Sequence, residues 1–276
     1  MSIDAILERI GHRAPLRSDA ETLHRLHAAW RHAVPYENID IQLGRTISLD
    51  PAVLLAKFGP RRRGGTCFEA NCALALLLRG AGFAVTLHEA AVRPWSGGDP
   101  EWGNHVALLV RTREGDWLAD AGIADGFVDP LPLREGRHVQ GPVTYRLKRV
   151  DADTWRWHHH PRGSVASYDL RTAEREPADF ARRAAVRPAE SGLERLLLAF
   201  RLRGERELTL RARTVTESTR DGTRLQRRVL GDRDAFRAAL AGDFGVPLSD
   251  LGPDGVEALW RRSGEQHGRH LAREGA

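Results

Sequence analysis

Residues 61–72 read Arg-Arg-Arg-Gly-Gly-Thr-Cys-Phe-Glu-Ala-Asn-Cys, and a run of alanines and leucines follows them. Within this segment Thr66 and Glu69 form a capping box, in which each side chain bonds the backbone N–H of the other at the start of a helix. The pattern predicts a helix that begins near Cys67, continues through the apolar run and stops near Gly80. Cys67 would then lie in the first turn of a buried helix.

This position gives Cys67 the setting of a nucleophile. A sulfur in the first helical turn lies near unpaired backbone N–H groups and the positive end of the helix dipole. Three arginines come just before it, and an electropositive setting favours the thiolate. The alternative is a small cysteine that only fills the core, and Cys72, one turn further into the apolar run, fits that interpretation well.

Helices are also predicted on the N-terminal side of this segment. The first ten residues read as an amphipathic helix rather than as an export signal. Ser18 and Glu21 form a second capping box, which opens a helix to about His32. Asp50 followed by Pro51 supplies an N-cap and a first helical residue for a short third helix.

On the C-terminal side the pattern changes to short β-type segments separated by turns. They run over residues 83–91, 105–110, 117–121, 143–150, 154–158 and 165–170, which indicates an antiparallel sheet or barrel. Beyond Ser191 we expect a helix over 193–200, strands over 207–215 and 223–230, and helices opened by Asp232 and Asp254. Helices, then strands, then a mixture predict an α+β protein of three sub-domains rather than a βαβ series.

A base for the thiol is predicted on two of these strands. His105 opens an apolar strand, and Asp120 lies among apolar residues of the next one, where each polar group needs a partner. A turn at 114–116 would join the two strands in a hairpin, although direct pairing of the two residues places its centre nearer 112–113. Each residue alone is most simply a hydrogen-bonded structural group. With Cys67 they supply a nucleophile, a base and an orienting carboxylate.

Other clusters weigh less. Residues 158–160 are three histidines that could bind a metal. Side chains alternate between the two faces of a strand, so neighbouring histidines would point in opposite directions. We therefore interpret them as an exposed strand end and predict no metal site. Residues 61–63 could contact phosphate, but three arginines are more often a solvated turn. The glycines lack the spacing of a dinucleotide fingerprint or a P-loop.

Composition excludes several classes of protein. Of the 42 basic residues, all but Lys57 and Lys148 are arginines, and the net charge is only +5, which is weak evidence for a nucleic-acid partner. No apolar run approaches the roughly 20 residues of a membrane helix. Cys67 and Cys72 on one helix are separated by a rise of about 7.5 Å, too far for an unstrained disulfide. A reduced, cytoplasmic protein is therefore expected, without nucleic-acid or membrane partners.

Four features together resemble the arylamine N-acetyltransferase family. Residues 63–71 match the family's R-G-G-x-C-x-E-x-N, and residues 35–38, Pro-Tyr-Glu-Asn, are close to its P-F-E-N. His105 opens an apolar strand, and Asp120 follows fifteen residues later, just before Gly122. The resemblance covers most of the chain and is looser from Arg206 to Leu248.

The resemblance implies a fold and a division into domains. It implies an N-terminal helical bundle over 1–83 that carries the cysteine, a central antiparallel β-barrel over 84–188 that carries the histidine and the aspartate, and a C-terminal α/β lid over 189–276. At their junction it implies a cysteine-protease-like Cys-His-Asp core.

The resemblance also implies the chemistry. Cys67 would take an acetyl group from acetyl-CoA as a thioester and pass it to an arylamine, hydrazine or N-hydroxyarylamine, with His105 moving the proton and Asp120 fixing the histidine tautomer. No permanently bound cofactor is implied, only acetyl-CoA or another acyl thioester as co-substrate. Glu37 and Arg63 would form a structural ion pair. Four residues are expected to bind substrate: Tyr36, Phe68, Gly122 and Ile123.

Three departures from the family pattern leave alternatives open. The family's D-V-G-F-G is Asp-Ala-Gly-Ile-Ala at 120–124, its H-P-x-S-x-F is Arg-Pro-Ala-Glu-Ser-Gly-Leu at 187–193, and Asn104 stands where threonine is common. The changed pocket residues are compatible with an amide synthase that takes a longer acyl chain from an acyl carrier protein. A catalytically silent binding protein with the same fold is the third hypothesis.

Overall fold

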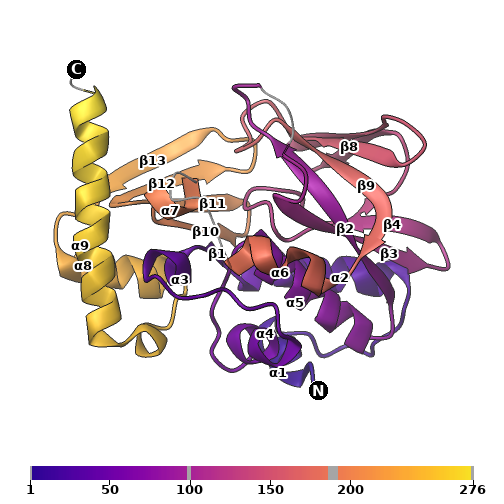
Figure 1. Cartoon of the computed structure of the whole chain (residues 1–276), viewed down its shortest axis with the longest axis horizontal. Coiled ribbons are helices and arrows are strands. Elements are labelled where there is room, and N and C mark those ends of the chain that lie inside the picture. The colour runs from indigo at the N-terminus through magenta and orange to yellow at the C-terminus, as the bar shows by residue number, and fades with distance from the viewer. Residues whose placement is uncertain (1, 98–100, 186–191, 275–276) are drawn as a thin grey trace.

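The computed structural model describes residues 2–97, 101–185 and 192–274, and places helices, an eight-stranded sheet and a mixed segment in succession along the chain. In Figure 1 the N-terminal helices lie along one side of both sheets, and helix α9 stands at the end of the molecule opposite the eight-stranded sheet. The predicted α+β class and its three-part order are confirmed. The domain boundary at 83/84 stays a prediction, and the one at 188/189 lies outside the described residues.

The N-terminal helices begin where their caps predict, with one displacement. Asp50 accepts hydrogen bonds from the backbone of Ala52 and Val53, as its N-cap role requires. The second helix is capped by Asp19 rather than Ser18, because the Asp19 carboxylate accepts from the Thr22 N–H at 2.9 Å. The elements of this part are α1 (Asp4–Arg9), α2 (Ala20–Ala33), β1 (Tyr36–Glu37), α3 (Ile39–Gln42), α4 (Pro51–Phe58) and α5 (Cys67–Gly80).

Helix α5 forms the centre of the N-terminal part. Its predicted start is confirmed, since the Glu69 carboxylate accepts from the Thr66 N–H at 3.1 Å and completes the capping box. A helix that is apolar on nearly every face has to lie in the interior. Accordingly α5 is buried along most of its length and packs on α4 and on the first two strands of the large sheet. Cys67, its first residue, thereby lies beside the start of β3.

The large sheet is antiparallel throughout and curls into a nearly closed barrel. Its outermost strands, β5 and β6, are consecutive in the chain and only three residues apart, which brings the two edges toward each other. Four fully buried aromatic rings, those of Phe127, Tyr145, Trp157 and Tyr168, fill the interior. The strands are β2 (Ala84–Arg93), β3 (His105–Thr112), β4 (Gly115–Ala119), β5 (Leu131–Pro132), β6 (Gly136–Gln140), β7 (Val143–Arg149), β8 (Thr154–His158) and β9 (Ser167–Arg175), and α6 (Pro177–Ala185) follows them.

The hairpin of β3 and β4 sets the position of the two predicted polar residues. Thr112 pairs with Gly115, so the turn consists of residues 113–114 and not of 114–116. Gly115 has a φ of +131°, a conformation that favours glycine. Asp120 does not pair directly with His105: it lies one residue beyond the end of β4, whereas His105 is the first residue of β3.

The C-terminal part contains a second, five-stranded sheet, which β1 joins at one edge. The helix predicted over 193–200 is wrong, because only a short helix forms there and the apolar residues after it belong to a strand paired with β11. The last helix bends at Gly252, two residues before its predicted opening at Asp254. The elements are α7 (Gly192–Arg195), β10 (Leu198–Arg203), β11 (Arg206–Arg211), β12 (Thr214–Thr219), β13 (Arg224–Val229), α8 (Arg233–Ala238), the π-helical turn η1 (Ala239–Asp243) and α9 (Leu248–Glu274). Within the described part of the chain, none of the helices has the length and apolar character needed to cross a membrane.

Candidate active site

The structure brings together Cys67 of α5, His105 of β3 and Asp120, the residue after β4. Cys67 is 8% exposed and lies at the first position of α5, where its sulfur is 3.9 Å from the carbonyl oxygen of Asn104. Nε2 of His105 hydrogen-bonds to Oδ2 of Asp120 at 2.7 Å, and the sulfur of Cys67 acts on the same imidazole and raises its pKa. Since Nε2 is held by the carboxylate, Nδ1 is the ring nitrogen left for the sulfur. The order sulfur, imidazole, carboxylate is that of a nucleophile, a base and an orienting group.

Electrostatics favour the protonated form of His105. Burial alone would lower its pKa, but the Asp120 carboxylate and the sulfur of Cys67 outweigh burial and raise the pKa well above its usual value. Burial would raise the pKa of Asp120, yet His105 and the other hydrogen-bond donors around the carboxylate lower it. Both residues are 1% exposed, so their interaction is shielded from solvent. An imidazolium beside Cys67 is the arrangement that stabilises a thiolate.

Asn71, to which sequence reasoning gave no role, orients the carboxylate. Its Nδ2 donates to Oδ1 of Asp120 at 2.8 Å and to the carbonyl of Val106 at 2.6 Å, and its Oδ1 accepts from the backbone of Ala121. Asn71 lies four residues after Cys67 on α5, so the two side chains share one helix face. From that spacing the sequence alone could have predicted that Asn71 lies near Cys67.

Gly122 lies directly against the backbone of the cysteine. A Cβ atom at this position would come within 2.8 Å of Cα and Cβ of Cys67 and of Nδ2 of Asn71. No real side chain tolerates such contacts without a shift of backbone. The backbone N–H of Gly122 also donates to Oδ1 of Asp120 at 2.7 Å, which ties this close approach to the carboxylate.

Beneath the cysteine lies a buried network of charged residues. Nη2 of Arg63 is 2.8 Å from Oε1 of Glu37, and neither side chain is exposed. Arg63 also contacts Asp40 at 3.2 Å and Asp250 of α9 at 2.8 Å. Its charge is therefore compensated by carboxylates and does not act on the sulfur alone. The interpretation of residues 61–63 as a solvated turn is wrong for this arginine, because the carboxylates around it allow it to be buried.

Lys57, also missed by sequence reasoning, is the second cation of this network. Its Nζ lies 2.6 Å from carboxylate oxygens of both Asp40 and Glu69, and the lysine is almost fully buried. Glu69 in turn caps the helix that begins at Cys67. Lys57 thus connects the helix start to the ion pairs of Arg63. Only a lone lysine within an apolar helix signalled it in the sequence.

Replacing Lys57 with methionine should destabilise the chain by about 3–5 kcal/mol, because two buried carboxylates would lose their shared cation. Urea unfolding followed by circular dichroism measures the loss. Lys148, the only other lysine, is exposed on β7, so Lys148→Met is a matched control with an expected change within about 0.5 kcal/mol. Equal stability of the two variants would contradict the network's contribution.

The four residues expected to bind substrate do not share one apolar cluster. Phe68 packs within the helical core, with its ring centroid 6.0 Å from that of Phe180. Ile123 belongs to the barrel interior, and Tyr36 packs with Phe200, its partner on β10 of the five-stranded sheet. Gly122 lies against Cα and Cβ of Cys67. The replaced segment 187–191 lies outside the described residues.

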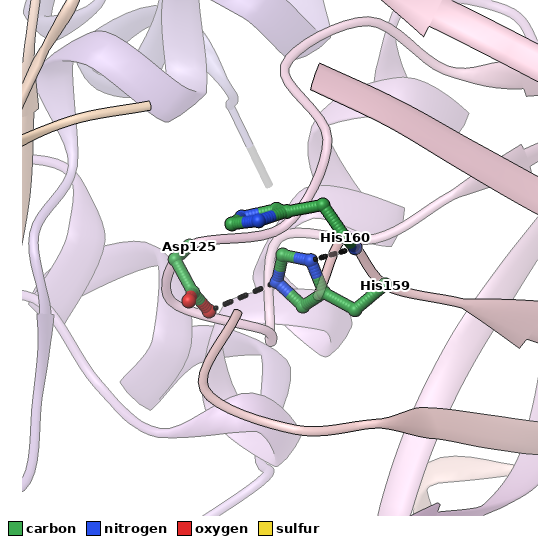
Figure 2. Close-up of side chains that lie close together, drawn as sticks. All are labelled: Asp125, His159 and His160. Carbon is green, nitrogen blue, oxygen red and sulfur yellow. Dashed lines mark hydrogen bonds and ion pairs between the residues drawn. The ribbon is translucent and has the colours of Figure 1, made fainter. Parts of the chain in front are cut away.

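Residues 158–160 do not form the exposed strand end that is predicted for them, since His158, the last residue of β8, is itself half-buried. His159 and His160 are buried, and with Asp125 they bring three potential ligand atoms within 4.8 Å of one another (Figure 2). The prediction is wrong because the chain turns inward after His158, and Asp125 faces the turn with its carboxylate 3.3 Å from Nε2 of His159. Ser164 donates to that carboxylate through both its N–H and its hydroxyl.

The hydrogen bonds of these two histidines oppose metal binding. Nδ1 of His159 accepts from the backbone N–H of His160 at 2.8 Å, and Nδ1 of His160 accepts from that of Arg162 at 3.3 Å. A neutral imidazole that accepts at Nδ1 carries its proton on Nε2. Each Nε2 is then a donor without a free lone pair, whereas a histidine ligand to a metal donates its other N–H to an acceptor. Of the two, only Nε2 of His159 lies near the Asp125 carboxylate, at 3.3 Å, while Nε2 of His160 has no hydrogen-bond partner among the described residues.

Comparison with known sequences finds one family throughout. A profile of the N-acetyltransferase family matches residues 19–251. The arylamine N-acetyltransferase / N-hydroxyarylamine O-acetyltransferase of Salmonella typhimurium is 34% identical over 163 residues, which cover 54% of this chain and 55% of that protein. The arylamine N-acetyltransferase of Escherichia coli is 28% identical over 247 residues, or 83% of each chain. In its match to the Salmonella protein, the chain thus spans about half of that relative's length.

Comparison with solved structures extends the likeness over almost the whole chain. The arylamine N-acetyltransferase of Mycobacterium marinum, solved in complex with CoA, superposes with a TM-score of 0.85 and 25% identity over 95% of this chain and 98% of that one. The Salmonella typhimurium enzyme superposes with a TM-score of 0.84 and 26% identity over 94% and 97%. Both the fold and the sequence are therefore similar to these proteins.

Proposed function

Since the chain belongs to the arylamine N-acetyltransferase family, we propose that it moves an acetyl group from acetyl-CoA, through a thioester on Cys67, to an arylamine, a hydrazine or an N-hydroxyarylamine. The observation that carries the proposal is the buried pair of His105 and Asp120, joined at 2.7 Å, whose imidazole also feels the sulfur of Cys67 at the N-terminus of α5. The relative from Mycobacterium marinum was solved with CoA bound, which supports the proposed donor.

In the first half-reaction the thiolate of Cys67 attacks the thioester carbonyl of acetyl-CoA. The new bond joins the sulfur of Cys67 to the acetyl carbon, and the bond from that carbon to the CoA sulfur breaks. His105, held in its protonated form by Asp120, gives its proton to the departing CoA thiolate. The products are acetyl-Cys67, free CoA thiol and neutral His105.

In the second half-reaction the amine attacks the acetyl carbon of the Cys67 thioester. Neutral His105 takes the proton that the amine loses, the bond from carbon to Cys67 breaks, and the thiolate–imidazolium pair returns. The backbone N–H of Cys67 lies in the first turn of α5, where N–H groups lack an intrahelical acceptor, and is suited to hold the oxyanion of each tetrahedral intermediate. Asp120 keeps the ring nitrogen that faces the sulfur free to accept protons.

The remaining expected residues receive supporting roles in the proposal. Glu37 and Arg63 hold the loop before Cys67 as a buried ion pair. Tyr36, Phe68, Gly122 and Ile123 are assigned to substrate binding, and of these Gly122 lies against Cα and Cβ of Cys67. We keep the division into domains at 83/84 and 188/189 as part of the proposal.

Mass spectrometry of the intact chain, with and without acyl donors, tests this function. Incubation with acetyl-CoA should add one acetyl group, a peptide map should place it on Cys67, and addition of an anilinic amine or a hydrazine should remove it. No acylation by acetyl-CoA together with labelling by a long-chain acyl carrier protein would favour the amide-synthase alternative. No acylation by either donor would leave only the silent binding protein and would refute the proposal.

A cytoplasmic location and reliance on small molecules complete the proposal. Both cysteines are free and buried, as expected in a reducing compartment. An acyl carrier protein is the one macromolecular partner considered, and the donor screen decides between it and acetyl-CoA.

A further inference from the structure

Helix α2 presents a buried histidine to the segment that carries the proposed catalytic carboxylate. His27 has no exposed surface, and its ring lies parallel to that of Phe127, with the centroids 5.7 Å apart. Its Nε2 lies 3.1 Å from the backbone nitrogen of Asp120, and its Nδ1 lies 2.6 Å from the carbonyl oxygen of Val128. One imidazole therefore joins both ends of residues 120–128.

These two contacts fix the tautomer of His27. A backbone N–H can only donate, so Nε2 must present a lone pair to Asp120. The ring proton is then on Nδ1, where it donates to the carbonyl of Val128. Burial lowers the pKa of His27 to about 4, so the ring stays neutral at physiological pH and both bonds persist. His27 thus acts as a fixed bridge and takes no part in proton transfer.

The hydrogen bond from Asp120 to His27 forms just beyond the point where strand pairing ends. The pairing of β3 with β4 ends at Ala119, one residue before Asp120. Beyond that point the backbone N–H of Asp120 finds its partner in His27 rather than in a neighbouring strand. Arg31, one turn further along α2, donates to the carbonyls of Ile123, Ala124 and Gly126 at 2.7–3.3 Å. Helix α2 therefore holds the segment over most of its length.

We propose that His27 is a positioning residue of the active site, which sets the carboxylate of Asp120 against Nε2 of His105 by holding the Asp120 backbone. This inference rests on the proposed function for its effect on turnover. Its mechanism is geometric, because an error of about 1 Å in the position of a catalytic group costs on the order of 10²-fold in rate. The side chain of Asp120 leaves the backbone at the very peptide that His27 fixes.

The test uses two variants of His27 and one control on the same helix. His27→Phe keeps a ring against Phe127 but removes both hydrogen bonds, whereas His27→Gln retains an acceptor and a donor. Trp30→Phe alters a buried α2 residue that stacks on Phe58 and has no part in the bonds to residues 120–128. Each is assayed for kcat and KM, for thermal stability, and for the pH dependence of Cys67 alkylation by iodoacetamide.

His27→Phe should lower kcat by about 10²-fold with little change in KM for acetyl-CoA, and should move alkylation of Cys67 to higher pH. His27→Gln should restore most of kcat and most of the wild-type alkylation profile. Trp30→Phe should change stability alone. Cys72 does not confuse the alkylation signal, because burial raises its pKa to about 12. Unchanged kcat and an unchanged alkylation profile in folded His27→Phe would overturn the proposal.

Two further outcomes remain decisive. If His27→Phe does not fold, His27→Asn replaces it, since asparagine is too short to reach both backbone groups. Relative to His27→Gln, it should show the same fall in kcat and the same move of alkylation to higher pH. If the wild-type chain takes no acetyl group from acetyl-CoA, the proposed function fails. The alkylation profile still tests the positioning of Asp120 in that case, because it needs no acyl donor.

Discussion

The Cys67→Ser variant should fold like the wild type and lose acetyl transfer by on the order of 10⁵-fold, since loss of a covalent nucleophile removes the step on which the other groups act. A serine hydroxyl is a far weaker acid than a cysteine thiol and stays protonated, so it cannot supply the anionic nucleophile of the proposed mechanism. Serine is slightly smaller than cysteine and fits the same position, so the thermal midpoint should barely move. Steady-state transfer to an anilinic amine and mass spectrometry of the acyl intermediate measure the effect.

Cys72→Ser is the matched control for this variant. Cys72 lies on the same helix in apolar surroundings, and burial raises its pKa to about 12, which removes it from nucleophilic chemistry. Burying a hydroxyl there should cost about 1–3 kcal/mol of stability, while activity per folded molecule stays near wild type. Substantial turnover by Cys67→Ser, or equal loss of activity in both variants, would refute Cys67 as the nucleophile.

Local rules of helix and strand formation predict the elements that frame the site. The capping box of Thr66 and Glu69 places the start of α5 correctly, because a cap is satisfied by residues three positions apart whatever surrounds them. The alternation in residues 154–158 gives β8 its observed bounds. The apolar run after α7 was misassigned, since a short apolar run does not distinguish a buried strand from a helix. Its identity as β10 is decided by pairing with β11 and with β1.

The sequence predicts those residues of the site whose chemical type is unusual for their surroundings. Cys67, His105 and Asp120 stand out because each is a reactive or polar group in an apolar context. The partners of Lys57 and His27 do not follow from the sequence, since packing chooses them: Lys57 meets carboxylates 12 and 17 residues away, and the His27 ring meets a backbone N–H 93 residues away. The burial of His159 and His160 depends equally on the distant Asp125, which no local pattern links to them.

Replacing Asp120 with asparagine should lower kcat/KM for acetyl transfer by on the order of 10⁴-fold while leaving the fold intact. Oδ1 of Asp120 accepts from Asn71 and from the N–H of Gly122, so the amide of the variant must keep its oxygen on that side. Its NH₂ group then faces Nε2 of His105 and donates to it. The neutral imidazole is thereby forced to carry its proton on Nδ1, the nitrogen that faces Cys67 and must accept the proton of the thiol.

The same substitution also removes the charge that raises the pKa of His105. The imidazolium would be lost at neutral pH, and alkylation of Cys67 by iodoacetamide should require higher pH than in the wild type. Asp116→Asn is the control, because it makes the same chemical change at an exposed position of β4 and breaks only a surface ion pair with Arg111. If Asp120→Asn turned over like Asp116→Asn, with an unshifted alkylation profile, the carboxylate would have no part in the mechanism. The 2.7 Å contact with His105 would then be structural alone.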